Sequence, residues 1–275
     1  MEATVDSLPG RPENAFPKKS SIALMMMSTT DPKHSDNDRQ KVLSTYDQLA
    51  HAVETVGYRH NPIYLARKAV VDWDLMHTAG IVGKSVLNVG CFEPIDELIW
   101  APSVAEWTAV DLTPQAIETA RRMVDRHLAP DIARKVKLLV MDAQKLEFPD
   151  NRFDVAVSFS VFDHIPDSVV RRNAVREMAR VVKPGGYVVI SVPNRHSYYR
   201  YMYERNVRRG VQLDVGYQYF YSRSELRNEL LNSGLRIVRF TSDMKNIGDL
   251  PKFARALLMP LVLFGDRMGF LAQKP

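Results

Sequence analysis

The chain has 275 residues, of which 45% are hydrophobic and 25% are charged, a balance typical of a globular domain. Its one cysteine, Cys91, excludes an internal disulfide framework and a cysteine-rich metal centre, and we expect no metal. No run approaches the roughly 18 apolar residues that span a bilayer, so the expected compartment is the cytoplasm.

The net charge of +5 is unevenly distributed. Residues 171–210 hold ten Lys or Arg and only two Glu. Such a window indicates an anionic partner, either a small acid, a phosphate, a nucleic acid or a lipid surface. A solvated helix face followed by a basic loop accounts for the same pattern, and both interpretations stay open.

The first 38 residues are rich in Pro, Ser, Asp, Lys and Thr and show no apolar period, which predicts a disordered tail. Residues 39–275 are expected to form one domain. From 39 to 80 the apolar spacing becomes helical, and Asn61-Pro62 has the residues of a helix cap and first turn. We therefore expect N-terminal helices before the sheet.

Strand-like and helix-like segments then alternate. Apolar runs predict strands at 85–89, 107–110, 136–141, 155–159, 187–192, 235–240 and 268–272. Helices are predicted at 95–100, 114–127 and 169–182, with a turn near 163–167. Thr113-Pro114 has the residues of a helix start, and Lys183-Pro184-Gly185-Gly186 those of a helix stop and turn. This alternation predicts an α/β fold with a three-layer, doubly wound, mostly parallel seven-stranded sheet.

Small or acidic residues follow four consecutive predicted strands. They are Gly90-Cys91, Asp111, Asp142-Ala143 and Ser158-Phe159. In a doubly wound sheet, ligands bind beyond the carboxyl ends of the strands. Asp111 lies 21 positions after Gly90, close to the roughly 20 expected for an acid that binds ribose hydroxyls.

Four stretches resemble the successive motifs of class I S-adenosylmethionine-dependent methyltransferases: VLNVGCFEP, WTAVDLTPQAIETARRM, VKLLVMDAQKLEFPDNRFDVAVSFSVFDHIPD and REMARVVKPGGYVVISVPN. The likeness is greatest to the subgroup of quinone-biosynthesis and small-molecule methyltransferases. It covers roughly residues 80–195, with a weaker echo in YFYSRSELRNELLNSGLRIVRF. The resemblance implies a Rossmann-like methyltransferase fold, S-adenosylmethionine as cofactor, and residues 81–192 as the cofactor-binding core.

The resemblance implies that the loop after the first strand holds the methionine part of the cofactor, with Asn88, Gly90 and Cys91 in the binding set. Gly90 would let the backbone approach the cofactor because no Cβ intervenes. Cys91 is expected to pack as a small buried residue rather than to act as a nucleophile. Ser158 and Phe159 would line the donor near its sulfonium.

The same resemblance assigns the adenosine part to the next two strand ends. Asp111 would accept both ribose hydroxyls, and Leu112 would pack on the adenine. Asp142 would accept from the adenine amino group while the Ala143 amide meets the ring. The alternatives are that Asp111 caps the following helix and that Asp142 is an ordinary turn acid.

Three residues depart from the family pattern. Asn88 stands where the family usually has an acid, and Phe92 and Pro94 stand where it has glycines. Because Phe92 cannot adopt a positive φ without strain, we expect the loop to follow another path. Pro94 is expected to be the first residue of a short helix, with Glu93 at its positive end.

His164, just beyond the fourth strand, is the candidate general base, since histidine can take a proton near neutral pH. A packing or capping role in the turn is the alternative. A metal site formed by Asp163, His164 and Asp167 lacks an evident third ligand group.

Residues 193–222 are predicted to cover the substrate. The candidate contacts there are Arg195, His196, Tyr198, Tyr199, Tyr217 and Tyr219. Tyrosine offers a flat apolar face with a hydroxyl, and arginine can grip an anion with two hydrogen bonds. This mixture suits an aromatic or carboxylated small molecule, and also stacked bases of a single-stranded nucleic acid. An amphipathic lid helix at 197–209 whose tyrosines simply pack is the alternative.

Residues 223–275 are expected to supply a C-terminal helix and the last strands. The apolar, basic stretch 250–264 could touch a membrane surface, pack in the core or form a dimer contact.

The leading hypothesis is S-adenosylmethionine-dependent methyl transfer to O, N or C of a small acidic or aromatic molecule. Two alternatives stay open. One keeps the fold and the adenosyl cofactor but performs different chemistry, such as cyclisation, and is motivated by the altered 88–94 loop. The other is a non-catalytic module that binds RNA or another anion and has lost the cofactor.

Overall fold

The computed structural model describes residues 68–211, 217–243 and 264–275. The predicted tail 1–38, most of the predicted N-terminal helical region and most of the stretch 250–264 lie outside the described residues.

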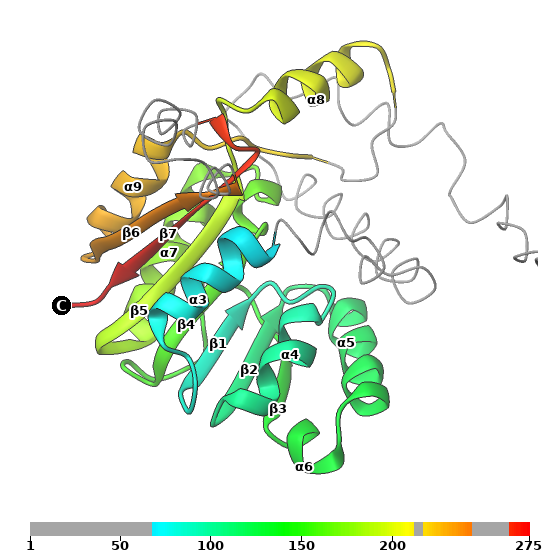
Figure 1. The fold of residues 1–275 in the computed structure, drawn as a ribbon, viewed down its shortest axis with the longest axis vertical. Helices are drawn as coiled ribbons and strands as arrows, with labels where there is room; N and C mark the ends of the chain where they lie inside the picture. The colour runs from blue at the N-terminus through cyan, green and yellow to red at the C-terminus, as the bar shows by residue number, and fades with distance from the viewer. Residues whose placement is uncertain (1–67, 212–216, 244–263) are drawn as a thin grey trace, which may run out of the picture.

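Seven strands form one sheet in the order β3-β2-β1-β4-β5-β7-β6 (Figure 1). They are β1 (Ser85–Val89), β2 (Glu106–Asp111), β3 (Val136–Val140), β4 (Phe153–Phe159), β5 (Val182–Pro193), β6 (Arg236–Ser242) and β7 (Arg267–Gln273). The five strands from β3 to β5 are parallel, and β7 runs antiparallel between β5 and β6. The predicted mostly parallel, seven-stranded sheet is confirmed.

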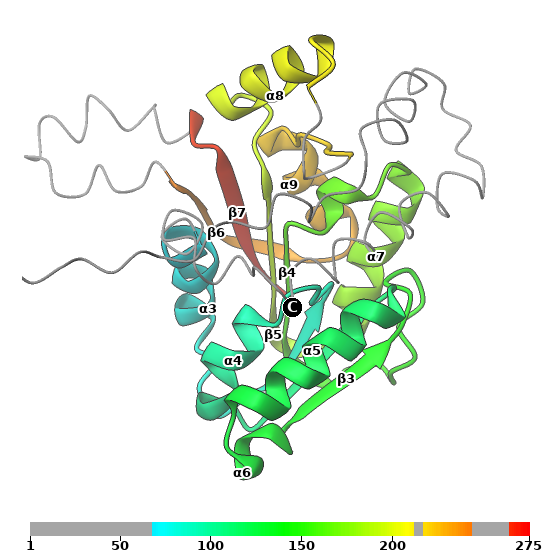
Figure 2. The ribbon, with the colours of Figure 1, turned by 90° about the vertical axis from the view of Figure 1, so that its right-hand side faces the viewer.

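Helices cover both faces of this sheet, which gives the predicted three layers (Figures 1 and 2). One core joins α3 (Asp74–Ala79), α4 (Ile95–Trp100) and α5 (Pro114–His127) to the sheet. The other joins α7 (Ser168–Val181) and α9 (Arg223–Asn232) to the opposite face. Strands covered on both faces are continuously apolar, and all five residues of β1 are buried.

The helices predicted at 95–100, 114–127 and 169–182 match α4, α5 and α7 within one residue. A five-residue π-helix, η3 (Ala69–Trp73), a short helix, α6 (Pro130–Ala133), and two 3₁₀ turns, η4 (Ala101–Ser103) and η5 (Phe162–His164), complete the first part. The π-helix and α6 were not predicted. The predicted lid helix corresponds to α8 (Tyr198–Arg208), which begins at the N-cap Ser197.

The helix stop predicted at residues 183–186 agrees with the end of α7 at Val181, but the turn predicted there is wrong. β5 begins at Val182 and includes them, and the register with β4 shifts between the pairs Phe153–Val182 and Val155–Tyr187. Gly185 N donates to the carbonyl of Lys274, and Lys274 N donates to that of Gly186. The segment is therefore a bulge within a strand, because its backbone groups pair with the end of the chain.

The strand order reverses between β1 and β4, since β2 and β3 extend to one side and β4 and β5 to the other. Ligands bind at such a point because the loops from the two neighbouring strands diverge to opposite faces. The residues that follow β1, β2, β3 and β4 therefore share one edge of the sheet.

Gly269 on β7 allows α3 and the π-helix to lie close to the sheet, because a Cβ there would lie 2.7 Å from Leu75 Cδ1 and 3.0 Å from Val71 Cγ1. We predict that Gly269→Ala lowers the free energy of unfolding by about 1–3 kcal/mol through overpacking. Denaturant titration of Gly269→Ala, Leu75→Ala and the double variant measures this. The two effects should not add, because Leu75→Ala removes the clashing atom; strict additivity would contradict the contact.

Candidate functional site

The loop after β1 turns at Gly90, which has a φ of +84° and donates its N–H to the carbonyl of Val110 at 2.7 Å. A Cβ at Gly90 would lie 2.3 Å from Val161 Cγ2. Glycine is therefore required both by the turn and by Val161 of the loop after β4. Cys91 is buried, and burial, with the charges of Glu97 and Asp111, holds the pKa of its thiol well above the ordinary value.

The loop avoids the strain that Phe92 would suffer at a positive φ. Among the described residues only Asn151 and Ser160 have positive φ without being glycine, so Phe92 lies in an ordinary region. Phe92 N donates to Asp111 Oδ2 at 3.1 Å. Pro94 is not the first helical residue as predicted but the N-cap of α4, because helical backbone angles begin at Ile95.

Asp111 joins the first two loops. Its Oδ2 accepts from Phe92 N, and its Oδ1 accepts from Thr113 N at 3.0 Å, at the start of α5. Desolvation by burial raises the pKa of Asp111, and the hydrogen bonds from Thr113 and Phe92 oppose that rise. Leu112 is partly buried beside it. The carboxylate thus shapes both loops while it lies at the carboxyl edge.

Asp142 lies next to Asp111 in space, because Met141 N donates to the carbonyl of Asp111 at 2.9 Å. Asp142 Oδ1 accepts from Gln144 N at 3.0 Å. This hydrogen bond closes a turn, as expected if Asp142 is an ordinary turn acid. Ala143 is partly buried in that turn. The adenosine-side candidates are therefore adjacent, and their ligand roles stay predictions.

Ser158 joins β4 to β1, the two neighbouring strands between which the strand order reverses. It is fully buried, and its hydroxyl donates to the carbonyl of Val89 at 2.8 Å. Phe159 is buried beneath the ammonium of Lys68, which lies 4.8 Å from the ring centroid. Ser160 has a φ of +54°, a strained value for a residue with a Cβ, and donates its N–H to the carbonyl of Ser191.

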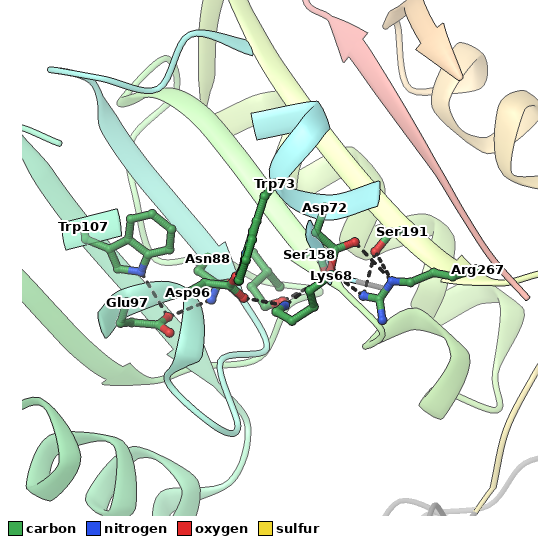
Figure 3. Close-up of polar contacts among 11 residues, drawn as sticks. Lys68, Asp72, Trp73, Asn88, Asp96, Glu97, Trp107, Ser158, Ser191 and Arg267 are labelled. Carbon is green, nitrogen blue, oxygen red and sulfur yellow. Dashed lines mark hydrogen bonds and ion pairs between the residues drawn. The ribbon is translucent and has the colours of Figure 1, made fainter. Parts of the chain in front are cut away.

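A band of buried polar side chains lies between the sheet and the helical segments that cover it on the side of α3 and α4 (Figure 3). Lys68 Nζ lies 2.8 Å from Asp96 Oδ2 and 3.3 Å from Asp72 Oδ2. Arg267 Nη2 donates to Asp72 Oδ2 at 2.8 Å and to Ser191 Oγ at 2.9 Å. Two cations and two anions thus offset one another where water is excluded, and losing one partner of such a pair costs about 3–5 kcal/mol.

Asn88 lies in the other half of this band. Its Nδ2 donates to Glu97 Oε1 at 2.7 Å, and Trp107 Nε1 donates to the same oxygen at 3.0 Å. All three side chains are buried. Burial, together with repulsion from Asp96, raises the pKa of Glu97 to about 7.

His164 is held in the turn after β4. Its Nδ1 lies 2.8 Å from the carbonyl of Tyr217, which can only accept, so Nδ1 carries the proton. Its Nε2 lies 3.3 Å from Asp163 Oδ2. Gln218 Nε2 donates to the same Asp163 oxygen at 3.2 Å. The histidine is therefore oriented by the Tyr217 carbonyl, with a buried carboxylate beside Nε2, and its catalytic role stays a prediction.

Helix α8 is tied to this turn through Gln218. Tyr199 Oη donates to Gln218 Oε1 at 2.9 Å, and Tyr199 and Tyr203 pack against Phe220. Tyr198 is 70% exposed on the outer side of the helix. Of these lid tyrosines, Tyr199 and Tyr203 therefore pack within the protein, whereas Tyr198 faces solvent.

Arg195, a candidate for substrate binding, is engaged within the chain. Its Nη2 lies 2.9 Å from both Glu225 Oε2 and Tyr219 Oη, and its Nε donates to the carbonyl of Phe220. Tyr219 Oη also donates to Glu225. His196 is exposed. Of these candidates, Arg195 and Tyr219 thus join the lid segment to α9.

Internal pairing also accounts for part of the basic window. Arg171 donates to the carbonyls of Ile165 and Pro166, and Arg180 pairs with Glu177 and Asp150. The high charge of the sequence is therefore partly structural, as the second interpretation of that window requires.

Sequence analysis missed the polar band and Gln218. Asp96 and Glu97 lie in the first turn of a helix, where acids are common, and the partners Lys68 and Asp96, like Asp72 and Arg267, lie far apart in the chain. The one sign of this polar band in the sequence was the presence of polar residues within elements that are otherwise apolar.

Over residues 68–211, 217–243 and 264–275, none of the helices has the length and apolar character needed to cross a membrane. In the same part of the chain, no three His, Cys, Asp or Glu side chains are grouped so that they could hold a metal ion.

The part of the chain that matches a known family lies within the predicted cofactor-binding core, residues 81–192. A methyltransferase domain family matches residues 87–190. The ubiquinone biosynthesis O-methyltransferase of Pseudomonas paraeruginosa is 28% identical over 154 residues, which cover 56% of this chain and 63% of the relative. The 2-methyl-6-phytyl-1,4-hydroquinone methyltransferase of Synechocystis is 36% identical over 110 residues, 40% of this chain and 32% of that protein. The chain thus spans less than two thirds of the length of these relatives.

Among solved structures, the N-methyltransferase NodS of Bradyrhizobium japonicum, in complex with S-adenosyl-L-homocysteine, is similar with a TM-score of 0.59 and 17% identity. The match covers 85% of this chain and 98% of NodS. At this identity the likeness shows the fold.

We predict that Gly90→Ala lowers the free energy of unfolding by about 1–3 kcal/mol, because alanine would be held at a positive φ and against Val161. Denaturant titration is the measurement. Combining it with Val161→Ala should recover the steric part of the loss, with Val161→Ala alone as the control. If the double variant shows no recovery, Val161 is not the clashing neighbour.

Proposed function

We propose that the chain transfers a methyl group from S-adenosylmethionine to a small molecule, as a member of the class I S-adenosylmethionine-dependent methyltransferases. The match of residues 87–190 to a methyltransferase domain family supports this proposal. The observation that carries the proposal is the shared edge formed by the loops after β1, β2 and β3. Backbone hydrogen bonds join Gly90 to Val110 and Met141 to Asp111, so the candidate residues of three loops lie together.

The donor set at this edge fits the cofactor chemically. Asp111 and Asp142 supply carboxylate acceptors for a ribose diol and an adenine amino group, and the partly buried Leu112 and Ala143 supply apolar contact between them. Hydrogen bonds from Phe92 N and Thr113 N fix the orientation of the Asp111 carboxylate. When bound, S-adenosylmethionine supplies an electrophilic methyl group.

Methyl transfer from a sulfonium is an in-line displacement that needs alignment of the acceptor and exclusion of water. A hydroxyl acceptor must also lose its proton. His164 Nε2 is the ring nitrogen that would take this proton, since Nδ1 donates to the Tyr217 carbonyl. Asp163, 3.3 Å away, would stabilise the resulting imidazolium.

We propose a phenolic hydroxyl, as in a catechol or hydroquinone, as the acceptor. The name of the first relative, an O-methyltransferase of ubiquinone biosynthesis, supports an oxygen acceptor. The name of the second, a hydroquinone methyltransferase, supports an aromatic ring with hydroxyl groups as the substrate. The aromatic side chains of Tyr199, Tyr203 and Phe220 beside the turn of His164 would suit a flat ring. We place this activity in the cytoplasm.

These relatives also favour methyl transfer over a different reaction on the same fold. A module that only binds anions is less well supported, because Arg171, Arg180 and Arg195 of the basic window have partners within the chain. We therefore propose a small molecule rather than a nucleic acid as the partner.

We predict that Asp111→Ala weakens binding of S-adenosylhomocysteine about tenfold or more, because the carboxylate acceptor of the ribose is lost. Isothermal titration calorimetry is the measurement, and Asp131→Ala, an exposed acid on α6, is the matched control. Unchanged affinity in a folded Asp111→Ala protein would show that the ribose contact is misplaced.

We predict that His164→Gln lowers kcat for methylation of a catechol probe by about 10²- to 10⁴-fold and leaves the affinity for S-adenosylhomocysteine unchanged. Transfer of a labelled methyl group measures this. His127→Gln, an exposed residue at the end of α5, controls for the loss of an imidazole. Retention of full kcat by His164→Gln would assign His164 to packing alone.

A further inference from the structure

Two buried polar atoms beneath the loop after β1 have no hydrogen-bond partner. They are Asn88 Oδ1 and Glu97 Oε2. The other terminal atoms of the same two side chains are bound to each other, with Asn88 Nδ2 2.7 Å from Glu97 Oε1. Asn88 is 2% exposed and Glu97 is fully buried, so bulk solvent does not reach them. Each unmet buried acceptor costs about 1–3 kcal/mol.

A proton on Glu97 Oε2 would give Asn88 Oδ1 a donor and would neutralise the buried carboxylate. We infer that Glu97 is protonated in the folded protein and donates from Oε2 to Asn88 Oδ1, forming an acid–amide pair that makes Glu97 a positioning residue for the 90–94 loop. The effect on the cofactor rests on the proposed function, whereas the pair itself does not.

The composition of the pair favours this state. A carboxylate can only accept, whereas a carboxylic acid presents one donor and one acceptor, which is the complement of the Asn88 amide. Trp107 Nε1 supplies a second donor to Oε1 at 3.0 Å, which leaves Oε2 as the oxygen that holds the proton. Asparagine at position 88, where the family usually has an acid, is therefore matched to a neutral Glu97.

The charged groups around Glu97 also favour the proton. Asp96 on the same helix repels a negative charge, and Asp96 is itself neutralised by Lys68 at 2.8 Å, so Lys68 is not left for Glu97. Burial and Asp96 together raise the pKa of Glu97 to about 7, which agrees with a shared proton near neutral pH.

The pair spans the whole loop. Asn88 lies on β1 two residues before Gly90, and Glu97 lies in the first turn of α4, nine positions after Asn88. Closing the pair fixes the strand end and the helix start together, and thereby the path of Phe92 toward Asp111. Loss of the proton removes one of its two bonds and leaves a buried carboxylate beside an unmatched carbonyl.

The direction of the pH effect follows from the raised pKa. The folded protein holds the proton more tightly than the unfolded chain, whose glutamate has the model value of 4.5. The stabilisation is therefore fully present below about pH 4.5 and is lost as the pH rises through about 7.

The first test measures the proton without any ligand. The free energy of unfolding of the full chain is followed from about pH 5 to about pH 9 for wild type, Glu97→Gln and the control Glu118→Gln, an exposed acid on α5. Glutamine mimics the protonated acid, because its amide can donate to Asn88 Oδ1. Glu97→Gln should gain relative to wild type as the pH rises, whereas the control should follow wild type. An identical pH slope in Glu97→Gln would overturn the inference.

If Glu97→Gln does not fold, infrared spectroscopy of Glu229→Gln decides, because this change removes the other glutamate whose pKa burial raises to about 7. The carbonyl stretch of a buried carboxylic acid should be present at about pH 6 and lost at about pH 9. Its absence at the lower pH would overturn the inference.

The second test separates the pair from the proposed function. The affinity for S-adenosylhomocysteine should fall about threefold or more in wild type as the pH rises through 7, and stay constant in Glu97→Gln. A parallel fall in both proteins would overturn the positioning role. If the first test succeeds but no variant binds at any pH, the pair stands and the cofactor assignment fails.

Discussion

The reversal of strand order between β1 and β4 is the constraint on which the site depends. The two strands are hydrogen-bonded neighbours, yet the chain leaves them toward opposite sides of the sheet. Ser158 on β4 bonds to the last carbonyl of β1, and Gly90 turns immediately afterwards under Val161. The candidate residues after β2 and β3 are placed relative to this junction, because backbone hydrogen bonds connect their loops to it in turn.

The buried polar band gives that junction its support. It reaches five neighbouring strands, since Trp107, Asn88, Phe159, Ser191 and Arg267 lie on β2, β1, β4, β5 and β7. Lys68, Asp72 and the first turn of α4, which lie outside the strands, complete the contacts (Figure 3). Such a network contributes little net stability, because desolvation offsets the attraction between charges. It does specify one arrangement of the helical segment over the carboxyl edge, because any displacement would leave a charge unpaired.

The altered loop is consistent with this support. A glycine-rich turn owes its shape to backbone freedom, whereas this loop is held at both ends by side chains. Asn88 and Glu97 join its two ends, and Asp111 accepts from Phe92 in its middle. The bulky residues at positions 92 and 94 are therefore tolerated without positive φ, because tertiary hydrogen bonds set the path that glycine would otherwise permit.

The sequence by itself determined the alternation of strands and helices and the residues at four strand ends, because periodicity and capping are local properties of the chain. β1 and α4 were predicted to the residue, and Asp111 and Asp142 were found by their position after strands. Only the tertiary structure decided which polar groups meet. Lys68 pairs with Asp96, Arg267 pairs with Asp72, and Arg195 pairs with Glu225 rather than being left for a ligand. Each of these contacts joins residues that the chain separates by tens of positions or more. The bulge at 183–186 was not predicted for the same reason. Its backbone hydrogen bonds pair it with Lys274, which lies far along the chain.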